Sequence, residues 1–445
     1  MVFRPILNFS TTRLYNKCVS YVDYINGIFV TKTGENELNF LLLDNLGSIN
    51  KEKVCYDFFK FDGFDDFCVD LKVIFGLLGY KFEDLQELLS LFNIDVKKYT
   101  ELFNKVVSHL QSYGVTKIDV ANISILHLMD ESLVKSFYEE KLLLIEGLHQ
   151  IAKSDNCFER LMKFYSGHLF EFMKCIKDLQ AKPIKVDLSA IQKDDNHFNS
   201  IKRSVTNDGY AKLSFDIAKS KNGRLSTRRG SFNIFTLSKD LRKCIVAEEG
   251  FSLCHIDYVS FQPRIAIFLC DDEQFKNKFK NVSDLYSEFN GDRSDNKLAL
   301  ISWLFSNQPN EQFDKKMSSI LTLRETIYNN NKLNNSRMEN IYGRPLNLIR
   351  EDKENVVFQN YISTTESDSL FEVFVEVSRL LNGMKSQIMF PFHDSIVFKI
   401  HEDETRLICD LSNLMSNFFV KERFFARFPV KVKTGKNFGE MRQYS

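Results

Sequence analysis

The feature that most constrains this chain is a short polar turn between two apolar runs, in the stretch PFHDSIVFKI. Residues 388–392 and 396–400 are rich in β-branched and aromatic residues, so they predict two short strands joined by the turn His393, Asp394 and Ser395. A tight turn of this kind holds its side chains rigidly. Taken alone, it is more often a hydrated hairpin tip than a functional site. A functional role for Asp394 therefore requires a second carboxylate that meets it.

A second acidic residue, Asp257, ends a strand-like run. The segment FSLCHIDYVSFQPRIAIFL begins with strand-like alternation and continues as an apolar helix, and Asp257 lies where one passes into the other. A carboxylate at the end of a buried strand loses hydration unless a cation or a donor compensates it. If that strand pairs with the hairpin, the spacing of about 4.8 Å between strands brings Asp257 close to Asp394. Two such carboxylates can share two divalent ions about 3.5–4 Å apart, an arrangement that assists phosphoryl transfer.

Between these two acidic residues, the segment DRSDNKLALISWLFSNQ repeats a side-chain pattern. Cations come first and apolar residues follow, an order that suits the phosphates, sugar and base of a nucleotide. An amphipathic surface helix explains the same pattern and is the simpler interpretation when the segment is taken alone. Four residues spaced four positions apart would form a slowly drifting stripe on one face of this helix: Arg293, Lys297, Ile301 and Phe305.

The composition is that of an ordinary globular protein. Hydrophobic residues make up 44% of the 445 positions and charged residues 27%, and no run is long enough to cross a bilayer. The first residues lack a basic segment followed by an uninterrupted apolar run, so we expect no signal peptide and a soluble, cytoplasmic protein without a membrane partner. The nine cysteines are scattered singly without zinc-ligand spacing, which favours reduced thiols and no structural zinc.

Charge is balanced over the whole chain but not locally. Lys and Arg together number 59, as do Asp and Glu, so the net charge argues neither for nor against a nucleic-acid partner. Residues 219–229 carry five cations and no acid, and residues 421–436 carry six cations against one glutamate. Such runs are more often solvated faces than binding sites, so they indicate function only if they flank a site.

The chain is long enough for two or three domains. Residues 1–80 mix strand-like runs with Asn/Gly turns and predict a small α/β region of unknown role. Residues 81–200 show helical periodicity as far as about residue 180, and Pro183 with the polar run that follows it marks a boundary. Strands and helices then alternate over residues 201–445.

Six short segments follow one another in an order that is known from one family. They are NGRLSTRRGSFNIFTL (222–237), LRKCIVAEEG (241–250), HIDYVSFQPR (255–264), the Arg293 helix, ENVVFQNYISTTESDSL (354–370) and FHDSIVF (392–398). This order resembles the palm and fingers of family A, or Pol I-like, DNA polymerases: TGRLSS, R…F, DYSQIELR, R-x3-K-x3-F-x3-YG, N-x3-Q and VHDE. One match would be weak, but six in order over roughly 200 residues are specific.

The resemblance implies an α+β right-hand fold and template-directed DNA synthesis. The fold would have an antiparallel-sheet palm, trimmed helical fingers at about 272–350, a helical thumb from residues 81–200 and the small N-terminal α/β region. Asp257 and Asp394 would hold two Mg²⁺ ions, for which Mn²⁺ can substitute, with the Tyr258 carbonyl as a further ligand. The partners implied are a primed DNA template and dNTPs.

The resemblance also implies roles for further residues. Arg293 and Lys297 would grip the incoming triphosphate, and Lys297 would also protonate the pyrophosphate leaving group. The complete nucleotide-binding set would be Arg293, Lys297, Ile301, Phe305, Gln262 and Tyr286, with Phe305 stacking at the templating position and Tyr286 replacing a phosphate-binding histidine. The DNA-binding set would be Arg224, Asn233, Arg264, Asn355, Gln359 and His393.

Four positions depart from the family's pattern. Gln262 stands where the family has the glutamate that excludes ribose 2′-hydroxyls; the amide keeps the bulk and loses the charge, so we expect weaker sugar discrimination. Ile301 replaces an aromatic residue that packs on the sugar, and Ser306 replaces a glycine. Ser395 replaces the last glutamate, which leaves two carboxylates of three, and the two aspartates suffice for the metals.

The chain also looks shorter than its relatives in two places. Asp257 and Arg293 are only 36 positions apart, which indicates trimmed fingers. Within residues 1–200 there is no D-x-E pair, which opens the family's 3′–5′ exonuclease, so we expect no proofreading and interpret residues 1–80 as a remnant or a replacement of that domain. A compact polymerase of this kind suits a virus, a mobile element or a repair role, and it would use a processivity or primase partner.

Three other interpretations stay open. Gln262 also suits an RNA polymerase or a reverse transcriptase built on the same palm. The changes at Ile301, Ser306 and Ser395 also suit a nucleic-acid-binding subunit whose palm has decayed, although both aspartates and the Arg/Lys pair remain. A metal-dependent nuclease would need a further carboxylate cluster, which the sequence does not show.

Overall fold

The chain divides into two compact units, Met1–Met162 and Lys163–Ser445, in a computed structural model. The predicted boundaries at residues 80 and 200 differ from this division, because helices that follow residue 80 pack on the N-terminal sheet. The residues that the structure describes are 19–25, 28–33, 38–42, 52–56, 67–82, 84–112, 131–191, 198–228, 230–306, 308–333, 338–346, 348, 352–421 and 423–444.

A mixed five-stranded sheet forms the first unit, in the order β3-β2-β1-β4-β5. β1 pairs antiparallel with β2, and β2 with β3, whereas β4 runs parallel to β1 and β5 parallel to β4. Helix α6 packs on the sheet, and α2 and α4 pack on α6. The elements are β1 (Val19–Ile25), β2 (Ile28–Thr33), β3 (Leu38–Leu42), β4 (Glu52–Cys55), β5 (Cys68–Asp70), α2 (Leu71–Leu77), α3 (Leu85–Leu91), α4 (Lys97–Ser112) and α6 (Glu131–Ser154).

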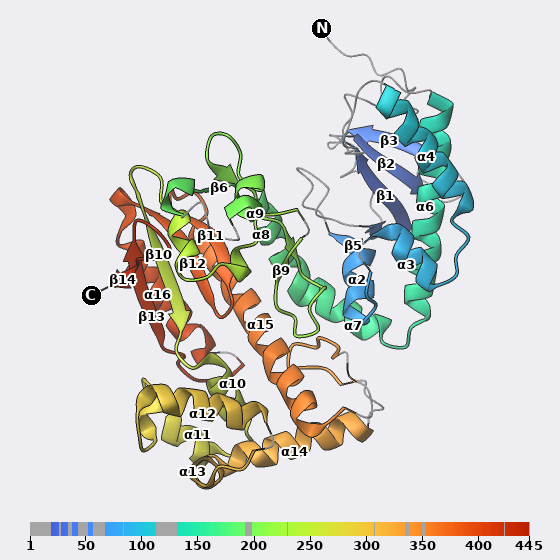
Figure 1. Cartoon of the computed structure of the whole chain (residues 1–445). Helices are drawn as coiled ribbons and strands as arrows, with labels where there is room; N and C mark the ends of the chain where they lie inside the picture. The colour runs from blue at the N-terminus through green and yellow to red at the C-terminus, as the bar shows by residue number, and fades with distance from the viewer. Residues whose placement is uncertain are drawn as a thin grey trace. The chain divides into compact units, whose positions relative to one another are not determined.

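An antiparallel five-stranded sheet, here called the C-terminal sheet, forms the centre of the second unit (Figure 1). Its order is β11-β12-β10-β13-β14, so the central strand β10 pairs with β12 on one side and with β13 on the other. The predicted α+β class with an antiparallel sheet is confirmed. The strands are β10 (Phe251–Tyr258), β11 (Gln387–Phe392), β12 (Ser395–His401), β13 (Val430–Gly435) and β14 (Arg442–Gln443).

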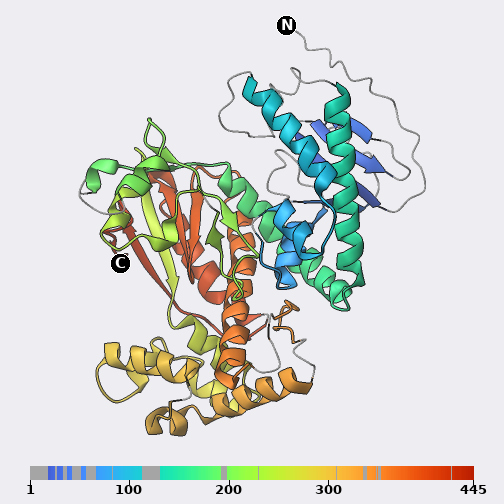
Figure 2. The same ribbon diagram turned by 45° about the vertical axis from the view of Figure 1, so that its right-hand side comes forward.

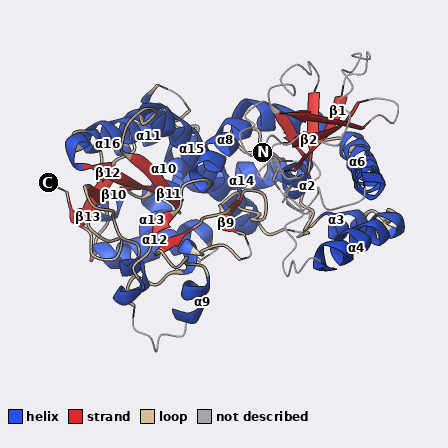
Figure 3. Ribbon diagram, turned by 90° about the horizontal axis from the view of Figure 1, so that it is seen from above, coloured by secondary structure: helices blue, strands red, loops and turns tan. Residues whose placement is uncertain are grey.

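Helices surround this sheet and extend beyond one end of it. Figures 1 and 2 show α11 to α14 gathered at one end of the long helix α15, which continues from them toward the sheet. α16 lies alongside the strands and contacts β10 and β13 (Figure 3). The helices are α8 (Phe170–Gln180), α10 (Phe261–Leu269), α11 (Glu273–Phe279), α12 (Arg293–Phe305), α13 (Glu311–Lys316), α14 (Ser318–Leu333), α15 (Glu354–Leu380) and α16 (Leu407–Asn417).

Short elements complete the second unit, and α7 (Phe158–Phe164) spans the division between the units. Among the described residues, no helix combines the length and the apolar character needed to span a bilayer. The short elements are η2 (Tyr165–Leu169), β6 (Ile184–Lys185), η3 (Leu188–Ala190), α9 (Phe198–Arg203), β7 (Tyr210–Ala211), β8 (Phe215–Asp216), β9 (Ser226–Thr227), η4 (Ile234–Thr236), η5 (Leu241–Cys244), η6 (Leu285–Glu288), η7 (Glu402–Glu404) and η8 (Phe418–Val420).

The middle of α15 holds an ion pair in the core. Asp368, with 0% exposure, accepts hydrogen bonds from Arg344 Nη2 at 2.6 Å and from Asn340 Nδ2 at 2.7 Å, and both of these side chains are also buried. The Tyr342 hydroxyl lies 2.9 Å from the hydroxyl of Ser369, the next residue of α15. The segment 338–346 is therefore fixed to α15 by polar contacts that exclude water.

Removing one charge of this pair should destabilise the second unit strongly, because the other charge stays buried without compensation. We expect Asp368→Asn to lower the free energy of unfolding by about 3–5 kcal/mol. Glu376→Gln, which disrupts the more exposed Glu376–Arg379 pair on the same helix, should lower it by less than about 1 kcal/mol. Denaturant unfolding of both variants checks this, and equal effects would contradict the account.

Candidate active site

The pairing of β10 with β12 brings Asp257 and Asp394 together, as the sequence predicts. Asp257 lies opposite Ser395 in the strand register, and the Tyr258 backbone N–H donates to the Asp394 carbonyl oxygen at 3.4 Å. Burial raises the pKa of both carboxyls, and the charge of Asp394 raises that of Asp257 further. These two residues are called the acidic pair below. Their charges interact, and both side chains keep some exposed surface.

Two strained backbone positions hold the acidic pair. His393, directly before Asp394, has a φ of 58°, and Ser260, three residues after Asp257, has a φ of 57°. Left-handed backbone of this kind costs roughly 1–2 kcal/mol for a residue other than glycine. Such strain persists only where the surrounding structure enforces it, and it is concentrated at functional sites. Both turns are thus set by the fold around the acidic pair.

Cations from separate elements face the acidic pair. The positive charge of Lys297 on α12 lowers the pKa of both carboxyls, partly offsetting burial. Lys433 on β13 does the same for Asp257, and Lys431 lies opposite Asp257 in the strand register. The basic run 421–436 therefore contributes cations beside the site, as the sequence interpretation required.

Helix α12 presents the predicted stripe away from the protein core. Arg293 and Lys297 are exposed, and Ile301 and Phe305 are partly exposed. The buried residues of this helix lie on other faces, and they are Asn296, Leu300, Trp303 and Leu304. Each of the four side chains keeps exposed surface, although Phe305 also lies 6.5 Å, ring centre to ring centre, from the buried Phe358. The stripe is therefore accessible to a ligand on the helix that contributes Lys297.

Buried polar contacts fix both ends of α12. At its start, the Asn296 amide donates to the carbonyl oxygens of Tyr286 at 3.0 Å and Phe289 at 3.1 Å. At its end, Arg324 of α14 donates to the carbonyl oxygens of Trp303 at 3.0 Å and Leu304 at 2.9 Å. Since helix ends carry unpaired backbone groups, these contacts hold α12 in one position.

Two predicted nucleotide or DNA residues, Tyr286 and Asn355, contact α12. The Arg293 guanidinium pairs with the Asp284 carboxylate and lies 5.4 Å from the centre of the Tyr286 ring. Tyr286 is 4% exposed, so its buried ring forms the surface against which the Arg293 guanidinium packs. Asn355, at the start of α15, donates to the Phe305 carbonyl oxygen at 3.4 Å and thereby ties α15 to the end of α12.

The segment NGR at 222–224 is docked on α15. The Ser367 hydroxyl donates to the Asn222 carbonyl oxygen at 3.1 Å, and Arg224 Nη2 donates to Glu366 Oε2 at 2.9 Å. Gly223 has a φ of 70°, and an added Cβ would lie 3.3 Å from Arg344 Cζ and 3.4 Å from Ser367 Cβ. Glycine is required here because a side chain would be strained and crowded.

Glu366 brings a carboxylate to the site that the sequence interpretation missed. It is 4% exposed, and its Oε2 accepts from both Arg224 and Gln262 Nε2, each at 2.9 Å. Burial, and then the charge of Asp394, raises the pKa of Glu366 to about 7, although Arg224 and Gln262 lower it. Glu366 is therefore a further acidic residue whose charge interacts with Asp394, and the sequence interpretation did not include it. Its partners lie 142 and 104 positions away, so no local pattern reveals them.

Ser395, which stands where the last glutamate was expected, closes the hairpin. Its hydroxyl donates to the Phe392 carbonyl oxygen at 2.5 Å and lies 2.7 Å from His255 Nε2, and the residue is 1% exposed. A glutamate side chain at this buried position would need both more volume and a solvated or paired charge. The serine is therefore a structural residue of the β11–β12 turn.

The prediction that Arg264 binds DNA is wrong. Arg264 is 0% exposed, and its guanidinium donates to the carbonyl oxygens of Val259 at 3.0 Å, Val282 at 2.6 Å and Ser283 at 3.0 Å. Burial lowers its pKa to about 10. Arg264 thus holds the start of α10 against the segment 282–283. The other predicted DNA-binding residues Asn233, Gln359, His393 and Arg224 are exposed.

The donor set suits a hard divalent cation. Among the described residues there is no group of three or more His, Cys, Asp or Glu side chains that could by itself enclose a metal. Mg²⁺ commonly binds through one or two carboxylates and completes its coordination with water and substrate phosphates. Two carboxylates whose mutual repulsion and burial raise their pKa values fit such an ion, since a cation relieves both effects.

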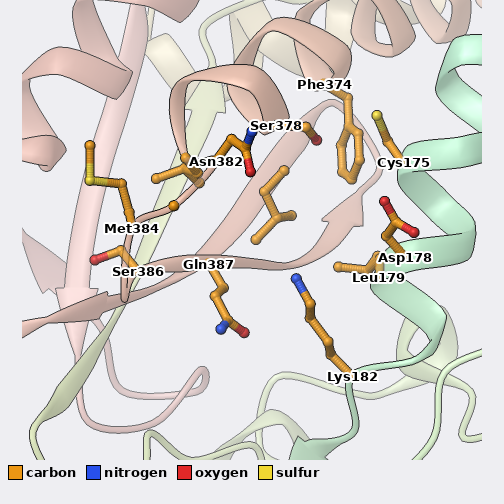
Figure 4. Close-up of a pocket in the computed structure, with 13 residues that line it drawn as sticks. Cys175, Asp178, Leu179, Lys182, Phe374, Ser378, Asn382, Met384, Ser386 and Gln387 are labelled. Atoms are coloured by element: carbon orange, nitrogen blue, oxygen red, sulfur yellow. The ribbon is translucent and has the colours of Figure 1, made fainter.

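A cavity of about 210 Å³ lies at the other end of the β11–β12 hairpin (Figure 4). It is lined by α8 through Cys175 and Asp178, by the end of α15 through Ser378 and by the start of β11 through Gln387. None of the residues predicted for the site lines this cavity. The acidic pair is therefore distinct from it.

Comparisons with known proteins agree with this geometry at the level of the fold. No protein-family model matches the chain, and a search of curated proteins finds no match. Among solved structures, the chain is similar to the POL domain of Pol1 from M. smegmatis in complex with DNA primer-template and dNTP, with a TM-score of 0.66. The identity is 12%, and the match covers 95% of each chain. The predicted resemblance to a Pol I-like polymerase is thus confirmed for the fold.

The raised pKa values make the metal-free protein less stable as the pH rises. Between the ordinary value of 3.8 and about 7, folded Asp257 holds a proton that the unfolded chain has released, so the free energy of unfolding falls with rising pH. We expect Asp257→Asn to raise the melting temperature at about pH 8, and to raise it less at about pH 5. Thermal unfolding in a chelator measures this, with the exposed Asp410→Asn as control. An equal shift at both pH values would contradict it.

Proposed function

We propose that this protein is a family A DNA polymerase that extends a primed DNA template with dNTPs by two-metal nucleotidyl transfer, without proofreading. The observation that carries the proposal is the convergence of Asp257 and Asp394, which lie 137 positions apart in the chain, beside the exposed Lys297. The fold shared with a POL domain that was solved with DNA primer-template and dNTP supports it.

The acidic pair would hold two Mg²⁺ ions, with the Tyr258 carbonyl as a further ligand, and Mn²⁺ would substitute. When bound, the metal ions lower the pKa of the primer 3′-hydroxyl and neutralise charge on the leaving pyrophosphate. The two carboxylates of Asp257 and Asp394 stay next to each other because the pairing of β10 with β12 fixes their backbone positions. Most of the rate would then come from positioning and charge stabilisation.

The α12 stripe would bind the incoming nucleotide. Arg293 and Lys297 lie on the N-terminal half of the helix, where cations can contact phosphates, and Lys297 can also give a proton to pyrophosphate. Ile301 and Phe305 follow on the same stripe and offer apolar surface to the sugar and base. Tyr286 would act through Arg293, whose guanidinium it faces.

The template and primer would lie over exposed basic and polar residues near the acidic pair. Arg224 is 44% exposed at its side chain although it also pairs with Glu366, so part of its guanidinium can reach DNA. His393, Asn233 and Gln359 are exposed, and Lys431 lies opposite Asp257. Phosphate contacts from such cations make binding salt-dependent. The helices of residues 81–200 would act as a thumb.

The absence of proofreading is proposed from the first unit. Its sequence has no D-x-E pair, and its described residues contain no cluster of metal-ligating side chains.

An RNA polymerase or a reverse transcriptase is the second candidate, favoured by Gln262 in place of a glutamate. Comparing dNTPs with rNTPs on DNA and RNA templates separates these functions.

Replacing either member of the acidic pair should abolish synthesis while leaving DNA bound. We expect Asp257→Ala and Asp394→Ala to lower the primer-extension rate by several orders of magnitude, because one carboxylate alone cannot place both ions. DNA affinity, measured at fixed salt, should change little, since neither residue supplies a cation.

Asp410→Ala, an exposed carboxylate on α16, is the matched control and should retain extension. Full activity in either Asp257→Ala or Asp394→Ala would refute the assignment. Mg²⁺-independent extension by the unmodified protein would refute the two-metal mechanism. No extension by the unmodified protein with any nucleotide would favour a decayed nucleic-acid-binding subunit.

A further inference from the structure

Glu366 is a buried carboxylate that the proposed mechanism leaves without a role. It lies on α15 between buried residues, and it is 4% exposed. A buried carboxylate is unfavourable unless cations or donors compensate it. The structure gives its Oε2 two donors at 2.9 Å, Arg224 Nη2 and Gln262 Nε2, and these residues belong to the two segments next to the acidic pair.

The contact with Glu366 fixes which end of the Gln262 amide faces α15. An ionised carboxylate only accepts hydrogen bonds, so when Glu366 is ionised the amide NH₂ of Gln262 faces it and the amide carbonyl oxygen lies on the other side. The same Nε2 lies 3.5 Å from the Ser363 hydroxyl, one helical turn before Glu366 on α15. Both contacts hold the side chain of Gln262 in one place and oppose a flip of the amide.

The two residues are also complementary in charge. A glutamate at position 262 would place a second carboxylate within hydrogen-bonding distance of Glu366, and like charges at that distance repel strongly. The neutral amide of Gln262 is therefore compatible with an ionised Glu366, whereas a glutamate at position 262 would not be. Position 262 on α10 carries no negative charge, but Glu366 on α15 does. Glu366 lies close enough to Asp394 for their charges to interact.

We propose that Glu366 is a specificity-determining positioning residue that fixes Gln262 beside the nucleotide sugar and so sets the preference for deoxyribonucleotides over ribonucleotides. This inference rests on the proposed function. The side chain of Gln262 can exclude a ribose 2′-hydroxyl only if it stays in place. Its hydrogen bonds to Glu366 and Ser363 hold it there. Glu366 acts through Gln262 and does not need to touch the substrate.

The test compares dNTP and matching rNTP incorporation by the full chain on a primed DNA template. We expect Glu366→Ala to lower the ratio of the two kcat/KM values about tenfold, the effect of losing one hydrogen bond to a charged group. Gln262→Ala should lower the ratio similarly, and the double variant should show no further fall, because both changes remove one restraint. Glu376→Gln, farther along α15, is the matched control and should keep the ratio.

A purely structural role for Glu366 would lower both kcat/KM values together and leave their ratio unchanged. An unchanged ratio in Glu366→Ala, or additive falls in the double variant, would therefore overturn the inference while primer extension by the unmodified protein still stands. If Glu366→Ala does not fold, Glu366→Gln keeps the volume and should still lower the ratio, since its amide group accepts more weakly than a carboxylate. No incorporation by the unmodified protein would overturn the proposed function together with this inference.

Discussion

The rest of the site depends on one constraint, the antiparallel pairing of β10 with β12. This pairing places Asp257 and Asp394 side by side where little water reaches them, so each raises the energy of the other when ionised. Such a pair is stable in its charged form only if positive charge is brought to it. Lys297 and Lys433 supply part of that charge from two further elements, and the proposed divalent cations would supply the rest.

A rigid frame surrounds this charged centre. Arg324 and Asn296 hold the two ends of α12, and the buried Asp368–Arg344 pair holds the segment 338–346 on α15. α15 in turn carries Glu366, which connects Arg224 with Gln262. Positioning of this kind would serve the proposed phosphoryl transfer, in which the protein would contribute geometry and charge and no covalent step.

The acidic pair, the hairpin and the α12 stripe could be predicted from the sequence because each has a strong local pattern. Asp257 and Asp394 end apolar runs, and the stripe follows the helical period. Glu366 could not be found this way, because its partners are distant in the chain. The resemblance implies DNA binding by Arg264, and its burial could not be predicted because the carbonyl oxygens of Val282 and Ser283, which accept from its guanidinium, come from another segment. The extent of the first unit, to Met162, likewise depends on long-range contacts, since α6 packs on the first sheet.

Metal binding tests the central claim most directly. Calorimetric titration of Mn²⁺ into the unmodified protein near neutral pH should show binding with release of protons, because the acidic pair is partly protonated without metal and must lose its protons to bind the ion. The same titration of Asp394→Asn should show much weaker binding and little proton release. Equal affinity and equal proton release in both proteins would contradict the claim that Asp257 and Asp394 share the cation site.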